Sequence, residues 1–424
     1  MKFQSLPGFR DFFPADHAAW RHIQLAWRLT AQRYAFEEYD GPPLESLELY
    51  VEKSGDEIVE QLYAFEDKGG RQVALRPEMT PTLARMVGEH GRSLPKPIRW
   101  FSMPQLFRYE RTQRGRLREH FQWNVDIIGE EDIAADAEVL AVALDGLSAL
   151  GLGTEDIVAR VNDRRLLEAL LLRAGVARES LGGAYAAIDK MSREGADRTR
   201  DRLRQDAGLD GPVVERVLAL FEHDLAGLRA AHAEDPAVAA ELDRLERYFT
   251  LLDEMGWSAH VQFDPRIVRG LAYYTGTVFE IFDRRGELRA ICGGGRYDDL
   301  LSAVSDLRLP AVGFGMGDVV LGELLRERQL LPTAPPGPDY CIITITEGER
   351  PLMRRIAGSL RRRGHSVSYT LRQVAVGKQF KDGNARGARE AIVLGPDEVA
   401  AGVAVVRGMD TGAERRMGLA ELAP

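Results

Sequence analysis

Cysteines, long apolar runs and metal-binding histidine patterns are scarce or missing in this sequence of 424 residues. Its 2 cysteines, Cys292 and Cys341, are too few for a disulfide framework or a cysteine-built zinc site, and they suit a reducing compartment. No apolar run approaches about 18 residues, so we expect no transmembrane helix. The N-terminus, MKFQSLPGFRDFFP, lacks the apolar core of a secretion signal. The 8 histidines show no HExxH-like spacing. These absences predict a cytoplasmic protein that neither spans a membrane nor holds a catalytic metal.

Basic residues are in the minority, because 56 lysines and arginines face 65 acidic residues and leave a net charge of −9. A non-specific nucleic-acid binder is normally basic, so this balance argues against that class. Residues 338–424 differ, with 14 lysines and arginines against 10 acidic residues. This excess predicts a local patch that could meet phosphate, although chance variation along the chain explains the same numbers equally well.

Proline marks the clearest boundary of the chain. Residues 331–338, LPTAPPGP, hold 4 prolines and predict a stiff linker between a first domain, 1–330, and a second domain, 339–424. In the second domain, strand patterns alternate with helix patterns. The strands are expected at 339–346, 365–371 and 391–394, and the helices at 349–363 and 375–387. This βαβαβ order predicts a small α/β domain with parallel strands.

The first domain combines helices with hairpins. Residues 16–38 predict a long helix, and residues 173–247 predict a helical insertion because they are rich in Ala, Leu, Arg, Asp and Glu at helical spacing. Apolar residues recur on or near one face of the first helix at Trp20, Ile23, Trp27 and Leu29. Hairpins are expected within 62–75, between 98–110 and 117–128, and between 278–281 and 290–292. Repeated hairpins with helices predict an antiparallel sheet flanked by helices, which is an α+β fold.

The loop of the second hairpin, FRYERTQRGRLREHFQ, is rich in arginine. If residues 108–110 continue the strand, Arg108 and Glu110 point the same way. Arginine offers planar donors to phosphate and Glu110 can accept from an amine, so the pair suits a polyphosphate joined to a base with an exocyclic amine. The alternative is a solvated loop with a surface ion pair. Without evidence from other segments, the composition of the loop favours this alternative. Its arginines are Arg108, Arg111, Arg114, Arg116 and Arg118.

Two further segments carry candidate binding residues. In LRPEMT, Glu78 and Thr80 either cap the following helix or accept from a cationic substrate group. In RGLAYYTGT, Arg269 precedes Tyr273 and Tyr274, and only one of two adjacent tyrosines can face inward on a strand. The glycine runs CGGGRYDD and GFGMGD match no full phosphate-binding fingerprint and are more typical of close packing.

Taken in order, these segments resemble histidyl-tRNA synthetase, a class II aminoacyl-tRNA synthetase. The resemblance covers nearly the whole chain and is weakest in the helical insertion. It rests on PGFRDFFP, YAFEEYDGPPLE as motif 1, FEDKGGRQVALRPEMT, FRYER and GRLREHFQ as motif 2, RGLAYYTGTVFE as the histidine signature, CGGGRYDDL, and VGKQFKDGNARGAREAIVLGPDE in the anticodon-binding domain. It implies a class II fold, activation of L-histidine with ATP and Mg²⁺, transfer to tRNA(His), and a homodimer formed around motif 1 at Pro42 and Pro43.

The resemblance also implies roles for individual residues. Arg108 and Arg269 are the expected catalytic residues, placed on the α-phosphate and the substrate carboxylate. The expected histidine-binding residues are Glu78, Thr80, Arg108, Gln122, Asp126, Arg269, Tyr273 and Tyr274. The expected ATP-binding residues are Arg108, Glu110, Arg116 and Phe121. Within ATP, Glu110 would meet the adenine amine and Arg116 the outer phosphates.

Three positions depart from the family pattern. Val320 stands where motif 3 usually carries an arginine for the ATP tail, and Ala272 stands where an aspartate is common. REHFQ reorders the aromatic pair before Gln122, so the ring that stacks on adenine is either His120 or Phe121. The departure at Val320 slightly favours an alternative, a histidine-sensing regulatory subunit of ATP phosphoribosyltransferase, but such chains generally lack the C-terminal domain. RGLAYY argues against a class II synthetase for another amino acid. The basic tail argues against an ATP-dependent ligase that does not use tRNA.

Overall fold

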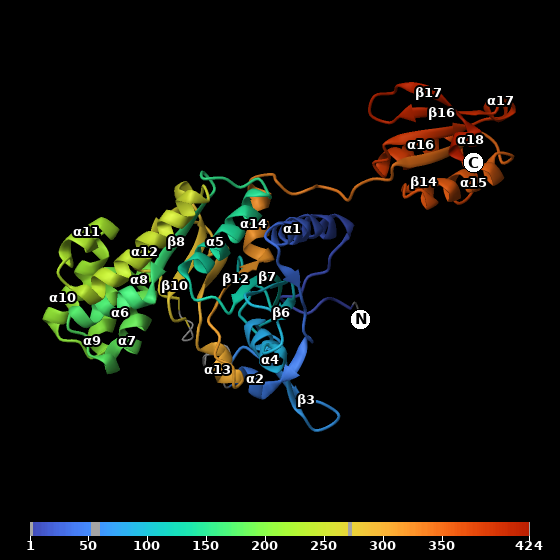
Figure 1. Cartoon of the computed structure of the whole chain (residues 1–424). Coiled ribbons are helices and arrows are strands. Elements are labelled where there is room, and N and C mark those ends of the chain that lie inside the picture. Colours follow the sequence, from blue (N-terminus) through green and yellow to red (C-terminus); the bar gives the residue numbers. More distant parts are fainter. Residues whose placement is uncertain (1–2, 52–59, 270–273, 424) are drawn as a thin grey trace. The chain divides into compact units, whose positions relative to one another are not determined.

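The computed structural model describes residues 3–51, 60–269 and 274–423 (Figure 1). The chain divides into two compact units, residues 1–13 with 19–332 and residues 14–18 with 333–424, and the main boundary between Pro332 and Thr333 lies inside the predicted linker. Each unit has its own sheet and its own hydrophobic core. In the described ranges, no helix combines the length and the apolarity that a membrane crossing requires.

The N-terminal unit is built on a 9-stranded sheet in the order β1-β5-β7-β12-β11-β10-β8-β9, with β6 also paired to β7. Its strands are β1 (Glu37–Glu38), β5 (Ile98–Ser102), β6 (Gln105–Phe107), β7 (Glu119–Ile128), β8 (Ile157–Asp163), β9 (Val261–Phe263), β10 (Thr277–Asp283), β11 (Cys292–Arg296) and β12 (Ala311–Gly317). All pairings from β5 to β8 are antiparallel. The predicted hairpins β5–β7 and β10–β11, and the α+β class of this unit, are confirmed.

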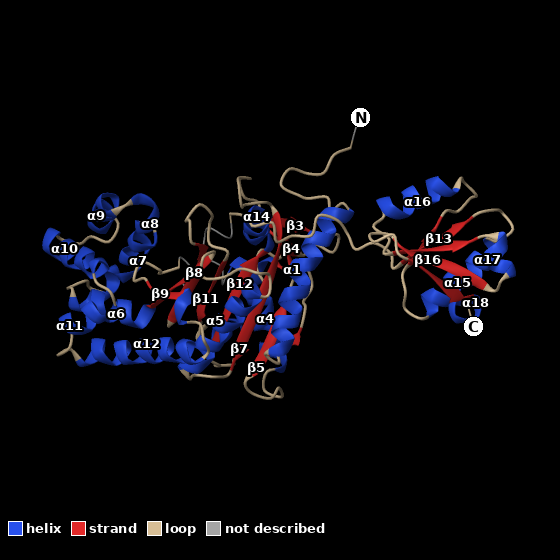
Figure 2. Ribbon diagram, turned by 90° about the horizontal axis from the view of Figure 1, so that it is seen from above, coloured by secondary structure: helices blue, strands red, loops and turns tan. Residues whose placement is uncertain are grey.

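Helices cover both faces of this sheet (Figure 2). On one face, α1 (Pro14–Arg33) and α5 (Ile133–Ser148) pack against the odd-numbered residues of β7. On the other face lie α4 (Thr80–His90) and α13 (Leu300–Val304). Because side chains alternate along a strand, each face of β7 meets a different layer of helices.

The first helix is shorter than predicted. It ends at Arg33 rather than at Glu38. The reason is that Ala35 takes a left-handed φ of 58°, after which the chain enters β1. Ile23 and Trp27 are buried as expected, but Leu29 is 49% exposed. Leu29 lies only two positions after Trp27, about 200° around the helix, so it belongs to the opposite face.

A buried ion pair joins the centre of the sheet to α5. The side chains of Arg296 in β11 and Asp136 in α5 are each 1% exposed. The Arg296 Nε lies 3.0 Å from one Asp136 carboxylate oxygen and 3.1 Å from the other. The guanidinium also donates to the backbone carbonyl of Glu130 at 3.0 Å. Two segments 160 residues apart in the sequence are thereby held together.

A separate small sheet in the order β2-β4-β3 precedes α4. Its strands are β2 (Leu44–Ser46), β3 (Tyr63–Glu66) and β4 (Gln72–Leu75), and the short helix α2 (Leu47–Val51) follows β2. The antiparallel pair β3–β4 confirms the hairpin predicted within 62–75. The N-cap of α4 is Met79, which makes no side-chain capping hydrogen bond, so of the two alternatives given for Glu78 and Thr80, a cap at Thr80 is wrong.

The helical insertion follows β8 and gathers at the β8–β9 edge of the sheet (Figures 1 and 2). Its helices are α6 (Arg164–Arg173), α7 (Leu181–Asp189), α8 (Met191–Glu194), α9 (Ala196–Gln205), α10 (Gly211–Ala219), α11 (Leu225–Ala231) and α12 (Pro236–Glu254). Aspartates at the N-caps of α10, α11 and α12 accept from backbone N–H groups, which explains where these helices begin. The prediction of helices over 173–247 is confirmed.

The C-terminal unit has a 5-stranded sheet in the order β14-β13-β15-β16-β17. Its strands are β13 (Tyr340–Thr344), β14 (Val367–Tyr369), β15 (Glu390–Leu394), β16 (Val403–Gly408) and β17 (Glu414–Gly418), and its helices are α15 (Arg350–Arg362), α16 (Val376–Ala385), α17 (Pro396–Ala400) and α18 (Leu419–Leu422). The predicted βαβαβ order and its parallel strands are confirmed by β13, β14 and β15. The sequence analysis missed β16 and β17, which add antiparallel pairs. The side chains of β17 are largely exposed, so no apolar alternation marks it.

Candidate active site

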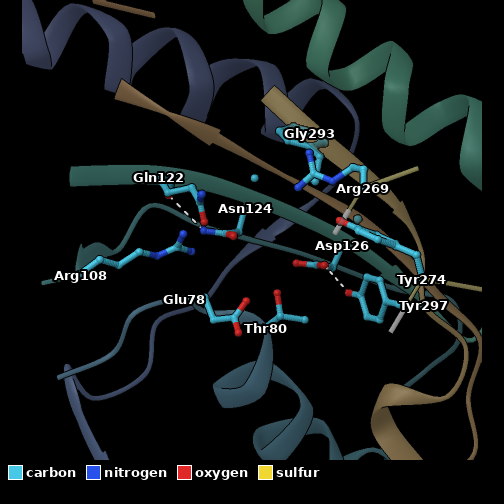
Figure 3. A pocket seen from close by; sticks show the side chains of 13 residues that line it. Glu78, Thr80, Arg108, Gln122, Asn124, Asp126, Arg269, Tyr274, Gly293 and Tyr297 are labelled. Carbon is cyan, nitrogen blue, oxygen red and sulfur yellow. Dashed lines mark hydrogen bonds between the residues drawn. The ribbon is translucent and has the colours of Figure 1, made fainter. Parts of the chain in front are cut away.

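One pocket on the α4 side of the N-terminal sheet brings together most of the predicted binding residues (Figure 3). It encloses about 80 Å³. Side chains of β7 reach it at every second position, because Gln122, Asn124 and Asp126 share one face of the strand. The pocket is lined by Glu78, Thr80, Arg108, Gln122, Asn124, Asp126, Arg269, Tyr274, Gly293, Tyr297, Gly313, Phe314 and Gly315.

Glycines on β11 and β12 leave the space that the pocket side chains occupy. A Cβ on Gly313 would lie 2.0 Å from Asp126 Oδ1, and one on Gly293 would lie 1.4 Å from Arg269 Nη1. A Cβ on Gly315 would lie 2.8 Å from Gln122 Cδ. The segment CGGGR is a buried strand rather than a phosphate loop, so close packing is the correct interpretation of these glycines.

Asp126 is the most strongly perturbed acid in the pocket. It is 5% exposed, and burial raises its pKa from 3.8 to about 7. The Tyr297 hydroxyl donates a hydrogen bond to Asp126 Oδ1, which offsets part of that rise. A carboxyl group with a pKa near neutrality exists in both protonation states at physiological pH, so Asp126 can accept or donate a hydrogen bond.

Arg269 enters the pocket from the segment before β10. Its backbone has a left-handed φ of 58°, and its Nη1 donates to Glu280 Oε1 at 3.1 Å. Its guanidinium carbon lies 5.6 Å from the centre of the Tyr274 ring. Burial raises the pKa of the Tyr274 phenol, so this hydroxyl keeps its proton. Tyr273 and Ala272 lie outside the described residues.

Arg108 lines the same pocket from the side of the motif 2 segment (Figure 3). Its Nε donates to the carbonyl oxygen of Pro77 at 2.9 Å, which ties it to the segment that carries Glu78. The structure therefore brings Arg108 and Arg269 to one cavity, although 161 positions separate them in the sequence. Two guanidinium groups at one cavity make it a site for anions.

Glu110 and Arg116 form an ion pair with each other and do not line this pocket. The expectation that Arg108 and Glu110 share a strand face is wrong, because β6 ends at Phe107. The N–H of Glu110 donates to the carbonyl of Arg108 at 2.8 Å, so the backbone turns there instead of continuing the alternation.

The two candidate stacking rings lie on opposite faces of β7. Phe121 faces α1, with its ring centre 4.4 Å from that of Trp20, so it is not brought to the pocket. His120 is on the face of Gln122 by alternation. Burial, reinforced by the positive charges of Arg108 and Arg10, lowers the pKa of His120 to about 3. The imidazole of His120 is therefore neutral at physiological pH.

Two polar residues that line the pocket, Asn124 and Tyr297, were not predicted from the sequence. Asn124 lies between Gln122 and Asp126 with the same two-residue period, so the alternation of β7 could have identified it. Tyr297 stands within CGGGRYDD, a segment interpreted only through its glycines. Within the described ranges, no three His, Cys, Asp or Glu residues are grouped so that they could hold a metal ion.

Comparison with solved structures identifies the fold. Histidyl-tRNA synthetase from Nostoc sp. PCC 7120 matches with a TM-score of 0.85 at 23% identity, covering 100% of this chain and 99% of that one. The synthetase from S. aureus matches with a TM-score of 0.71 at 24% identity, covering 100% and 99%. An ATP phosphoribosyltransferase regulatory subunit/histidyl-tRNA synthetase from Bacillus halodurans C gives 0.77 at 23% identity, covering 93% and 99%. The N-terminal unit thus has the fold of a class II aminoacyl-tRNA synthetase.

Sequence comparison identifies the family. The family model described as histidyl-tRNA synthetase matches residues 8–317, and the anticodon binding domain model matches residues 339–424. Histidine–tRNA ligase of Opitutus terrae is 45% identical over 97% of this chain and 95% of its own length. The chloroplastic/mitochondrial enzyme of Arabidopsis thaliana is 38% identical over 98% and 85%. The chain belongs to the histidyl-tRNA synthetase family.

Proposed function

We propose that this chain is a histidine–tRNA ligase, which activates L-histidine with ATP and transfers the histidyl group to the 3′-end of tRNA(His). The observation that carries the proposal is the single pocket in which Arg108 and Arg269 meet the carboxyl groups of Glu78 and Asp126. In the first step, the histidine carboxylate attacks the α-phosphorus of ATP, forming a C–O–P bond and releasing pyrophosphate. Both reactants are anions, so the enzyme's main tasks are orientation and charge neutralisation.

Arg269 and Arg108 are proposed to supply that neutralisation. Arg269 would contact the α-phosphate as charge shifts towards pyrophosphate, while Glu280 holds its guanidinium at 3.1 Å. Arg108 would bridge the carboxylate and the phosphate from the other side of the pocket. In the second step, a terminal ribose hydroxyl of tRNA attacks the acyl carbon of the adenylate and releases AMP.

The acids and hydroxyls of the pocket suit an imidazole side chain. Neutral imidazole has one N–H donor and one lone pair, so its recognition needs both an acceptor and a donor. Asp126, with a pKa of about 7, can serve as either partner. A pocket built on such bonds rejects apolar isosteres by a factor on the order of 10⁴. The proposed histidine contacts are Glu78, Thr80, Arg108, Gln122, Asp126, Arg269 and Tyr274, with Asn124 and Tyr297 added, and Tyr273 by resemblance.

ATP is proposed to bind beside this pocket on the motif 2 segment. Glu110 would accept from the adenine amine, and Arg116 would meet the outer phosphates, so ATP would replace the present Glu110–Arg116 ion pair with two substrate contacts. For the stacking ring we favour His120, because Phe121 packs against Trp20 on the other face of β7. Magnesium is proposed to enter as the counter-ion of the ATP phosphates, without a protein cage of its own.

The C-terminal unit is proposed to bind the anticodon stem and loop of tRNA(His). The net charge of +4 over residues 338–424 supports this assignment, as does the family model that spans the unit. Deletion of residues 339–424 is expected to spare histidine-dependent ATP–pyrophosphate exchange and to impair tRNA charging. Equal loss of both steps would contradict this division of labour between the units.

We also propose a cytoplasmic homodimer. Its support in the structure is a set of exposed apolar side chains on the N-terminal unit, on or beside the elements that flank motif 1. They are Leu25, Leu29, Leu44, Val51 and Phe65. A monomer by light scattering at micromolar concentration would refute the dimer.

The histidine-sensing regulatory subunit is the second candidate. The likeness to the Bacillus halodurans structure favours it, since that protein is named for both roles. The high identity to histidine–tRNA ligases over nearly the whole chain argues for the enzyme instead.

The deciding experiment is ATP–pyrophosphate exchange with each of the twenty amino acids, followed by charging of purified tRNA. Histidine alone should support exchange, and only tRNA(His) should be charged. Histidine binding without exchange would favour the regulatory subunit, and exchange with another amino acid would contradict the specificity.

A further inference from the structure

The tip of the motif 2 segment is fastened to α14 (Asp318–Glu327) by charged and backbone contacts. Gln113 and Arg116 form an isolated antiparallel bridge, which leaves Arg114 and Gly115 at a two-residue turn. The Arg114 Nε donates to Glu323 at 3.1 Å, and its Nη2 donates to Glu327 at 2.6 Å. The Gly115 N–H also donates to Glu323 at 3.0 Å. Glu323 therefore accepts hydrogen bonds from both the Arg114 side chain and the Gly115 backbone of the turn.

The surface of α14 below the turn is shaped for this contact. Val320, Glu323 and Glu327 are spaced three and four residues apart, so they lie on one stripe of the helix. A Cβ on Gly115 would lie 3.3 Å from Val320 Cγ2, so the backbone of the turn rests almost directly on this valine. A longer side chain at position 320 would push the turn away. Gly115 also has a left-handed φ of 73°, which favours glycine at this point of the turn.

The turn carries Arg116, whose position matters for the proposed function. Arg116 pairs with Glu110 at the base of the same turn, and the backbone of 108–118 has little other regular structure. A loose turn would have to be ordered when ATP binds, and that entropy would weaken binding. If the turn is already ordered before ATP arrives, ATP binding to Arg116 and Glu110 does not have to offset this loss of entropy.

We propose that Glu323 and Glu327 are positioning residues for ATP, which hold the turn around Arg114 and Gly115 so that Arg116 is presented to the polyphosphate. The proposal rests on the proposed function, because it assumes that Arg116 contacts ATP. The two carboxylates do not touch the substrate. They act through Arg114 and the Gly115 N–H, and their loss should weaken ATP binding without altering the histidine pocket.

The test is the KM for ATP in histidine-dependent pyrophosphate exchange, measured on the full chain. Glu323→Ala should raise the KM for ATP about tenfold, with kcat and the KM for histidine within about twofold of wild type. Glu323→Gln keeps an acceptor for the Gly115 N–H and should recover most of the loss. Arg114→Ala leaves the hydrogen bond from the Gly115 N–H to Glu323 in place, so it should raise the KM for ATP by less than Glu323→Ala does, and the double variant should be no worse than Glu323→Ala.

The insertion offers a matched control. Arg200 also pairs with two carboxylates, Glu215 at 2.9 Å and Asp197 at 2.8 Å, on a surface away from the pocket. Arg200→Ala should leave all three kinetic constants unchanged. Circular dichroism melting of each variant checks the fold, and Arg114→Ala, at a side chain that is 63% exposed, serves if Glu323→Ala fails to fold.

Four results would overturn the proposal. They are an unchanged KM for ATP in Glu323→Ala and Arg114→Ala, an equal rise in the KM for histidine, a fall confined to kcat, and additive effects in the double variant. Absence of exchange in the wild-type protein would contradict the proposed function itself and is thereby distinguished from a failure of this inference.

Discussion

The two faces of β7 differ in composition and in purpose, although they belong to the same ten residues. Trp123, Val125 and Ile127 point into the core beneath α1 and α5, where each is at most 1% exposed. Gln122, Asn124 and Asp126 point into the pocket. Between positions 122 and 127, the strand therefore fills the core with its odd residues and lines the proposed ligand pocket with its even ones. Substitutions at neighbouring positions of β7 should therefore affect stability and ligand binding separately.

The largest effect is expected at the pocket. Arg269→Ala should reduce kcat/KM for histidine-dependent pyrophosphate exchange by about 10³-fold, since it removes a cation from the developing charge on the α-phosphate. The unfolding free energy should change little, because Arg269 is partly exposed and its partner Glu280 can reach water. Activity of the variant within a few-fold of wild type would remove the role assigned to Arg269.

The opposite face should show the reverse pattern. Trp123 is fully buried, its ring centre 5.8 Å from that of Trp27 and 5.1 Å from that of Phe314. Trp123→Ala should lower the free energy of unfolding by about 3–5 kcal/mol because it leaves a cavity between sheet and helices. Urea denaturation measures this loss. Asn124 is the next residue along the strand. If Asn124→Ala lowers the free energy of unfolding as much as Trp123→Ala does, the two faces of β7 do not have separate roles.

The free energy of unfolding should depend on pH through Asp126. Its pKa is raised from 3.8 to about 7 in the folded chain, so the folded state binds a proton more tightly than the unfolded state does. The resulting stabilisation is present below about pH 4 and is lost as pH rises through 7. Asp126→Asn should remove that loss, which is on the order of 4 kcal/mol. Urea titrations of both proteins from pH 4 to 8, without ligands, should reveal it. Parallel pH profiles would show that Asp126 is not perturbed.

The smallest effect is expected at Gly315. An added Cβ would meet the end of the flexible Gln122 side chain at 2.8 Å, and that side chain can move into the pocket. Gly315→Ala should therefore raise the KM for histidine about tenfold while the Tm changes by less than about 3 °C. A large fall in Tm with unchanged KM would mean that the glycine serves the sheet rather than the ligand.

The elements that were predicted from the sequence carry a regular apolar pattern, although β16 carries one as well and was missed. The hairpins β3–β4, β5–β7 and β10–β11 and the alternation of β13 to β15 all carry such a pattern. The prediction failed for the exposed strand β17 and for the end of α1, where burial or a single left-handed residue decides the outcome. Local pattern does not report either feature.

Candidate site residues were predicted unevenly. Gln122, Asp126, Arg108 and Arg269 follow from the family resemblance, yet only the fold brings them to one cavity. Asn124 was missed, although the alternation of β7 places it on the face of Gln122 and Asp126. The alternation was extended wrongly to 108–110, where the backbone turns after Phe107. Applied to β7, the same alternation places Phe121 and Gln122 on opposite faces of the strand.

The buried pair of Arg296 and Asp136 has a consequence for how the chain folds. Arg296 is in the same strand as Gly293, and its charge is out of water only when α5 is also in place. A partly folded chain with β11 inserted and α5 detached would leave the Arg296 guanidinium without Asp136 and with Asp298 as its carboxylate partner at 3.2 Å, which is costly enough to keep that state sparsely populated. The central strand and α5 should therefore form and melt together, and their slowest amide protons should exchange with deuterium at a common rate.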